Sequence, residues 1–236
     1  MKTDLPAAIN DTMRRLILAI ICAAISACSD DANDPIGFSQ EELSPVVTFT
    51  HSNKLVRISN TNSGLWTNDK ALNANGGEIP GKSTKGFGSV IDSSGNGKYQ
   101  VTILISKWIG DGEIDYVIPN IGLEIIKPET FKSIFTTGQR LYARNANPIN
   151  TTNEVVIQYF DENATSWSSC YQGNYYSTPS YSELQPSSSF IITRSMPIGT
   201  DSIFVEAKFK ARLYKNETEY FTINDGYFKG SFYRKP

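Results

Sequence analysis

Alternation of apolar and polar side chains is clearest near the C-terminal end of the chain, over residues 202–213. Successive side chains of a strand face opposite ways, so such a pattern places the apolar positions on one face and the charged positions on the other. The apolar positions are Ile203, Val205, Ala207, Phe209, Ala211 and Leu213, and the charged positions are Glu206, Lys208, Lys210 and Arg212. The sequence therefore predicts a strand with one buried face and one solvated face.

Two turn signals follow this strand. Lys215-Asn216-Glu217-Thr218 predicts a first reversal of the chain, and Asn224-Asp225-Gly226 predicts a second, because these residue types favour tight turns. We therefore expect a three-stranded antiparallel meander in which the strand over 202–213 is followed by strands over 219–223 and 227–233.

Beyond Pro45 the chain repeats short β-branched and aromatic runs that are separated by Gly, Asn, Asp and Ser, a pattern typical of strands and hairpins. One short helix is expected over 128–135, where Pro128 suits the first helical turn. The other expected strands are 46–50, 55–59, 88–92, 99–108, 115–118, 123–126, 154–160 and 190–194. We therefore predict an all-β fold, a single antiparallel β-sandwich with a barrel-like form as the alternative.

The first 27 residues have the pattern of a bacterial lipoprotein signal peptide. Arg14 and Arg15 precede an apolar run over 16–25 that is too short to span a bilayer. The run ends in Ile25-Ser26-Ala27-Cys28, which has the form of a lipobox: small residues admit the peptidase, and the cysteine thiol accepts the lipid. A simple secretory signal that is cleaved near residue 27 is the alternative.

These features divide the chain into three parts. Residues 1–27 are the expected signal peptide, with Met13 as an alternative start. The part from the lipidated Cys28 to residue 44 is polar and acidic and is expected to be a flexible tether. The β-sandwich domain is expected over 45–236. We therefore expect the membrane to be a partner, through the lipid on Cys28.

Two stretches carry a resemblance to known proteins. Ser29-Asp30-Asp31 resembles the surface-export signal of lipoproteins in the Bacteroidetes phylum, and the closing pattern over 207–232 is similar to that of small outer-membrane lipoproteins of the same phylum. The resemblance implies a lipid-anchored protein of the outer membrane that faces outward. A protein that faces the periplasm is the alternative. The family has no established activity to transfer.

The net charge and the cysteine content limit which partners and which covalent cross-links are expected. The net charge of the chain is −2, and no stretch clusters Lys and Arg, so nucleic acid is excluded as an expected partner. Of three cysteines, Cys22 leaves with the signal and Cys28 is lipidated. Only Cys170 remains, which rules out an internal disulfide, and we expect it to be a partly buried small residue.

One motif matches a nucleotide-binding pattern but lacks its context. Residues 76–83 fit the form Gly-x4-Gly-Lys-Ser, which needs a buried strand before the loop and a helix after it. Neither is predicted, so we expect a glycine-rich surface loop and no nucleotide. His51 is the single histidine, and no nucleophile motif accompanies it, so neither histidine-based catalysis nor a cofactor is expected.

Three acids stand close together as Asp111, Glu113 and Asp115. Alternate residues of a strand share a face, so their carboxylates form a weak candidate for a calcium site, or for the paired carboxylates of a glycoside hydrolase. The alternative is a solvated acidic hairpin loop.

The segment over 166–189 is rich in Ser and Tyr and is the best candidate for recognition. Aromatic rings give rigid contact area, and small polar residues give adaptable hydrogen bonds, as in a glycan-binding loop. The candidate ligand-binding residues are Trp167, Tyr171, Tyr175, Tyr176 and Tyr181. The alternative is a loop that packs over one end of the sandwich with its aromatic rings buried.

Together these observations predict a non-enzymatic, lipid-anchored lipoprotein of the outer membrane with a binding or assembly role. The first alternative is a carbohydrate-binding accessory lipoprotein in glycan capture, and the second is a carboxylate-dependent glycoside hydrolase. An outer-membrane protein and a polysaccharide remain open as partners.

Overall fold

Strands make up most of the described chain. The computed structural model describes residues 42–59, 61–72, 78–92, 99–143, 154–170, 184–216 and 218–235. All of them belong to one unit, Phe38–Pro236. The expected signal peptide, Cys28 and nearly all of the expected tether lie outside the described residues.

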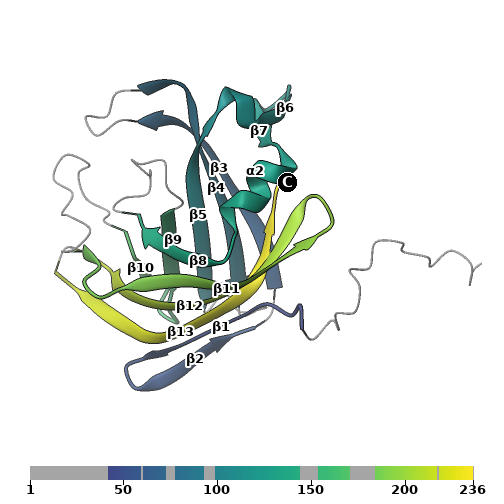
Figure 1. Ribbon diagram of the computed structural model, residues 1–236. Coiled ribbons are helices and arrows are strands. Elements are labelled where there is room, and N and C mark those ends of the chain that lie inside the picture. Colours follow the sequence, from purple (N-terminus) through teal and green to yellow (C-terminus); the bar gives the residue numbers. More distant parts are fainter. Residues whose placement is uncertain are drawn as a thin grey trace, which may run out of the picture. The chain divides into compact units, whose positions relative to one another are not determined.

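The first half of this unit contains eight strands and two short helices (Figure 1). Its strands are β1 (Val46–His51), β2 (Lys54–Ile58), β3 (Thr61–Leu72), β4 (Glu78–Asp92), β5 (Gln100–Gly110), β6 (Ile114–Ile118), β7 (Leu123–Ile126) and β8 (Gly138–Tyr142). The helices are the 3-10 turn η1 (Asp111–Glu113) and the helix α2 (Pro128–Ile134). The second half adds β9 (Glu154–Phe160), β10 (Ser166–Ser168), β11 (Ser189–Ile198), β12 (Ser202–Tyr214) and β13 (Tyr220–Tyr233).

Eleven of these strands form one sheet, in the order β2-β1-β13-β12-β11-β8-β9-β5-β4-β3, and the short β10 pairs with both β9 and β12. All pairs in the sheet are antiparallel except β8 with β9. The strands β6 and β7 form a separate small sheet. The fold is therefore all-β and predominantly antiparallel, as the sequence predicts.

The large sheet bends back over itself. Figure 1 shows β11, β12 and β13 running across β3, β4 and β5. The two layers meet where Gly230 of β13 faces Ser89 of β4, since a Cβ at position 230 would lie only 2.7 Å from the Ser89 hydroxyl. The Trp66 indole N–H also donates to the Tyr233 carbonyl at 2.9 Å. The glycine thus permits a close approach of β13 to the opposite layer.

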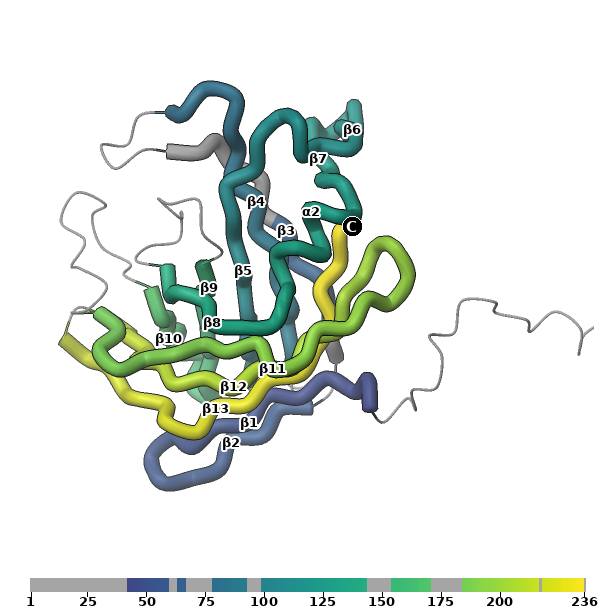
Figure 2. Tube along the Cα trace, in the orientation of Figure 1, coloured from purple at the N-terminus to yellow at the C-terminus, as the bar shows by residue number. Residues whose placement is uncertain are grey.

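Aromatic side chains fill the space between the layers and continue onto α2. Phe87 of β4 contacts Phe131 of α2 in an edge-to-face arrangement, with ring centroids 5.2 Å apart, and Phe135 lies 4.6 Å from Phe232 of β13. All four side chains are buried. Figure 2 shows α2 beside the C-terminal end of β13. The expected helix over 128–135 is confirmed, and its apolar face closes one end of the core.

Buried charges fix the C-terminal end of the chain against the small sheet. Arg234 is only 4 % exposed, and its guanidinium binds Asp201 at 2.6 Å and Asp115 at 2.9 Å. It also donates to the Ile126 carbonyl at 2.7 Å. A buried charge requires partners of this kind, because desolvation is costly. The side chain thereby joins β6 and β7 to the end of β13.

One predicted turn is wrong. The expected reversal at Asn224-Asp225-Gly226 lies inside β13, which continues as one strand. Between the pairs Ala211↔Ile223 and Phe209↔Gly226, β13 has one residue more than β12, so the site is a β-bulge. The reversal at Lys215-Asn216-Glu217-Thr218 is confirmed, because β12 and β13 pair in antiparallel fashion on either side of it.

The expected surface loop over 76–83 is also wrong for its described part. Residues 78–83 belong to β4, which pairs with β3 on one side and with β5 on the other. A strand with no helix after it cannot form the phosphate-binding loop that the motif resembles. No helix among the described residues has the length and apolar character needed to cross a membrane.

Candidate functional site

A cleft of about 350 Å³ lies between the β1–β2 hairpin and the β9–β10 hairpin. We call it the hairpin cleft. Its lining combines aromatic rings, carboxylates and cations from three separate parts of the chain. The lining residues are His51, Ser52, Lys54, Leu55, Val56, Arg57, Tyr99, Tyr159, Asp161, Glu162 and Asn163.

The β1–β2 turn sets one wall of this cleft. Ser52 and Asn53 both have positive φ angles, of 50° and 59°, and His51 pairs with Lys54 across the turn. Two consecutive positive φ angles are the signature of a tight two-residue hairpin, a conformation that Asn tolerates well. The turn places the His51 ring and the Lys54 ammonium group at the same end of the hairpin.

The His51 ring forms part of the cleft floor. It stacks on Phe221 with a centroid distance of 4.0 Å, and it meets the edges of Tyr159 and Trp167 at 6.1 Å each. Burial lowers the pKa of His51 below its ordinary value, and the opposing effect of the Asp161 charge is smaller. At neutral pH this histidine is therefore an uncharged, flat aromatic surface.

Asp161 forms the opposite wall and is held rigidly. Its carboxylate accepts hydrogen bonds from the Trp167 indole N–H at 3.0 Å and from the backbone N–H groups of Asn163 and Thr165 at 2.9 and 3.0 Å. Burial acts to raise the pKa of Asp161, but these hydrogen bonds together lower it below the usual range. The carboxylate is therefore ionised and oriented at neutral pH.

The rim of the cleft carries both paired and unpaired polar groups. The Tyr99 hydroxyl donates to Glu162 at 2.9 Å, and this hydrogen bond raises the pKa of Tyr99. Lys54 and Arg57 are exposed, and their side chains form no hydrogen bond or ion pair with another residue that the structure describes. The cleft thus offers aromatic faces, oriented acceptors and two available cations.

Of the five expected ligand-binding residues, only Trp167 lies within the described chain. It is 8 % exposed and belongs to the main hydrophobic core, where it meets Phe221 at 5.1 Å. Its covered ring cannot serve as an exposed stacking surface, and its contribution to the cleft is the hydrogen bond that holds Asp161. Tyr171, Tyr175, Tyr176 and Tyr181 lie outside the described residues.

The three acids expected as a weak metal candidate do not converge. Glu113 accepts from the Gly110 backbone N–H at 2.9 Å and pairs with Lys107 at 3.3 Å, while Asp115 is bound to Arg234. Within the described part of the chain, no group of three His, Cys, Asp or Glu side chains could hold a metal ion. The carboxylates of Glu113 and Asp115 are thus partners of the cations Lys107 and Arg234.

Cys170 is more deeply buried than the sequence suggests. It is 2 % exposed, and its sulfur lies 3.1 Å from the Ser168 hydroxyl. Burial raises the pKa of the thiol. The side chain is therefore a protonated packing residue at neutral pH.

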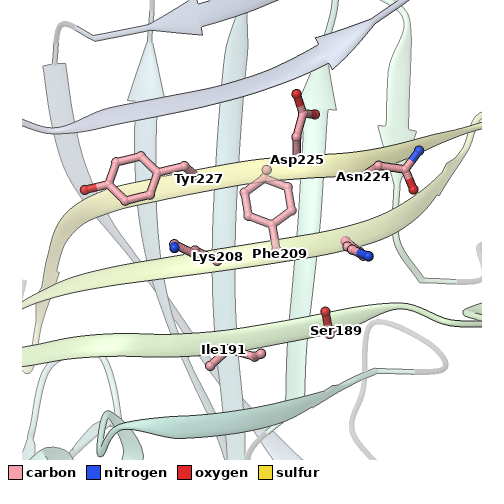
Figure 3. Close-up of a pocket in the computed structure, with 9 residues that line it drawn as sticks. Ser189, Ile191, Lys208, Phe209, Asn224, Asp225 and Tyr227 are labelled. Carbon is pink, nitrogen blue, oxygen red and sulfur yellow. The ribbon is translucent and has the colours of Figure 1, made fainter.

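A second depression, of about 310 Å³, lies over the β-bulge between β12 and β13. We call it the bulge groove. Figure 3 shows Lys208 and Phe209 on β12, Asp225 and Tyr227 on β13, and Ser189 and Ile191 on β11. The lining residues are Ser189, Ile191, Lys208, Phe209, Lys210, Asn224, Asp225, Gly226 and Tyr227.

Comparisons of this chain with protein-family models, with curated proteins and with solved structures gave no match.

Proposed function

We propose that this chain is a non-enzymatic, lipid-anchored lipoprotein of the outer membrane that faces outward and binds a saccharide in the hairpin cleft. The anchor follows from the lipobox around Cys28, and the outward orientation from the resemblance of Ser29-Asp30-Asp31 to an export signal. The lining of the hairpin cleft is the observation that supports the ligand class.

A sugar ring presents an apolar face and a rim of hydroxyl groups. The hairpin cleft matches both, because the rings of His51 and Tyr99 line the same space as the carboxylates of Asp161 and Glu162. A pocket with apolar surface and a few placed polar groups is the usual form of a small-ligand site. Its volume of about 350 Å³ suits one or two sugar units better than a folded partner.

The state of Asp161 excludes it as the general acid of a glycoside hydrolase. A glycoside hydrolase needs one carboxylic acid whose pKa is raised, so that it can protonate the leaving group. Hydrogen bonds from Trp167, Asn163 and Thr165 lower the pKa of Asp161 instead. An ionised carboxylate of this kind accepts hydrogen bonds from ligand hydroxyl groups.

The anchor is tested by replacing Cys28 with serine. We expect the Cys28→Ser chain to leave the membrane fraction and the Cys22→Ser chain to stay there, because only Cys28 accepts the lipid. Fractionation of cells followed by immunoblotting measures the distribution. Equal membrane association of both variants would contradict lipid anchoring at Cys28.

The ligand is tested by replacing Tyr99 with alanine. Loss of an aromatic contact at a binding site should weaken affinity by about tenfold. Tyr99→Phe keeps the ring and should retain most of the affinity. Tyr116→Ala is the matched control, because Tyr116 is 42 % exposed on β6 and does not line the cleft.

The measurement is calorimetric titration of the lipidated full chain in detergent with maltohexaose, cellohexaose and mannohexaose. Binding of one of them that is lost in Tyr99→Ala and retained in Tyr116→Ala supports the proposal. Binding of none, or equal loss in both alanine variants, would refute it.

A further inference from the structure

The bulge groove owes its shape to one extra residue in β13. The bulge at Asn224 and Asp225 stands opposite Lys210 and interrupts the regular pairing of β12 with β13. Gly226 carries no side chain there, and the Phe209 ring occupies the space that a Cβ at position 226 would need. The result is a depression on the sheet, with Tyr227 and the 41 % exposed Ile191 among its walls.

The acids around this groove already have partners. Asp225 accepts hydrogen bonds from the Thr50 backbone N–H at 3.1 Å and from the Thr50 hydroxyl at 2.8 Å. Glu206, on the neighbouring part of β12, pairs with Arg194 at 3.0 Å and accepts from the Tyr227 hydroxyl at 3.3 Å. Neither carboxylate requires a cation from the groove.

The cations lack such partners. Lys208 and Lys210 are exposed, and their side chains make no hydrogen bond or ion pair with any residue in the described part of the chain. Alternate residues of a strand share a face about 7 Å apart, so both ammonium groups border the same groove. The Asn224 amide and the Ser189 hydroxyl also line it and form no side-chain hydrogen bond with described residues.

We infer that the bulge groove binds the carboxylate-bearing sugar unit of an acidic polysaccharide. Lys208 and Lys210 attract the carboxylate, Asn224 and Ser189 exchange hydrogen bonds with hydroxyl groups, and the walls of Tyr227 and Ile191 contact the apolar face of the ring. The preference for a negatively charged ligand follows from the residues of the groove alone. The inference that this ligand is a sugar rests on the proposed function.

The surrounding carboxylates argue against nucleic acid as the occupant. Nucleic-acid sites neutralise closely spaced phosphates with many cations. Here Asp225 and Glu206 lie beside two lysines and would repel a dense row of phosphates. The spaced carboxylates of a polysaccharide fit two cations, and sugar hydroxyl groups can donate to acidic neighbours.

The test compares two double variants with the same change in net charge. In the first, Lys208→Gln and Lys210→Gln remove the groove cations. In the second, Lys127→Gln and Lys132→Gln remove lysines from the region of α2, outside the groove. Affinity of the lipidated full chain in detergent is measured for polygalacturonate, for its methyl ester, which is uncharged, and for single-stranded DNA.

We expect the groove variant to bind polygalacturonate about tenfold more weakly than the native chain, because each lost charged hydrogen bond carries a large share of affinity. The α2 variant should bind it like the native chain, and the methyl ester should bind weakly to all three. No binding of polygalacturonate, equal loss in both variants, or stronger binding of DNA would overturn the inference.

A last comparison separates this inference from the proposed function. Tyr99→Ala alters the hairpin cleft and leaves Lys208 and Lys210 in place, so it should retain binding of polygalacturonate at the bulge groove. Suppose that neutral hexasaccharides do not bind while the lysine-dependent binding of polygalacturonate persists. That result refutes saccharide binding in the hairpin cleft and supports the inference about the bulge groove. The reverse result removes the bulge groove alone.

Discussion

Gly226 and Phe209 show how a single missing side chain determines a surface feature. The two residues pair across β12 and β13, and the Phe209 ring occupies the space that a side chain at 226 would need. A Cβ at that position would lie 2.3 Å from a ring carbon of Phe209. The glycine is therefore required by close packing inside the sheet.

Gly226→Ala should destabilise the fold by about 1–3 kcal/mol, the usual cost of overpacking a buried site. Gly112→Ala is the control, because no atom lies within 4 Å of the Cβ that it would add. Urea unfolding followed by tryptophan emission measures both free energies of unfolding.

A second substitution checks the cause. Phe209→Leu removes part of the ring, so the pair Gly226→Ala with Phe209→Leu should be more stable than the two separate losses predict, since residues in contact couple. Equal stability of Gly226→Ala and Gly112→Ala would show that the ring moves aside without cost.

His51 shows what residue identity alone leaves open. From the sequence it could be judged only as a catalytic group without partners, and that judgement overlooked its value as a flat aromatic surface. Its stacking on Phe221 joins residues 170 positions apart in the chain. No local sequence pattern predicts such a contact, so the position of His51 in the hairpin cleft could not be predicted from the sequence.

Elements with strong local patterns are predicted well. The strict alternation over 202–213 corresponds to β12, and the Pro-initiated segment over 128–135 corresponds to α2. The side chains that the alternation assigns to the interior of β12, such as Phe209, are buried. Hydrophobic periodicity identifies an element where one face packs against the core.

Elements that depend on distant partners are missed. β3 and the first part of β4 are polar and glycine-rich, and they form strands because they pair with each other and with β5. Strand formation reflects pairing and packing more than intrinsic preference. The chain reversal predicted at Asn224, Asp225 and Gly226 is wrong because the same residue types also suit a β-bulge.

The candidate sites combine residues that are distant in the sequence and that only the folded sheet brings together. The hairpin cleft combines residues near positions 51–57, 99 and 159–163, and the bulge groove combines residues near 189, 208 and 225. The sequence shows no run of basic residues, yet folding brings Lys208 and Lys210 next to Ser189 and Asn224. The expected N-terminal signal is the opposite case, since the proposal for it rests on a local sequence pattern that needs no folded partner.

The single histidine of the chain makes the central claim directly measurable, because its imidazole gives one set of NMR signals. Titration of the lipidated chain in detergent with the neutral hexasaccharide that binds should shift these signals. It should also lower the pKa of His51 further, since a bound sugar excludes water and disfavours the charged ring. The Tyr99→Ala chain should show neither change at the same concentration. Imidazole signals that stay unchanged while the saccharide binds would place the ligand elsewhere and contradict the hairpin cleft as its site.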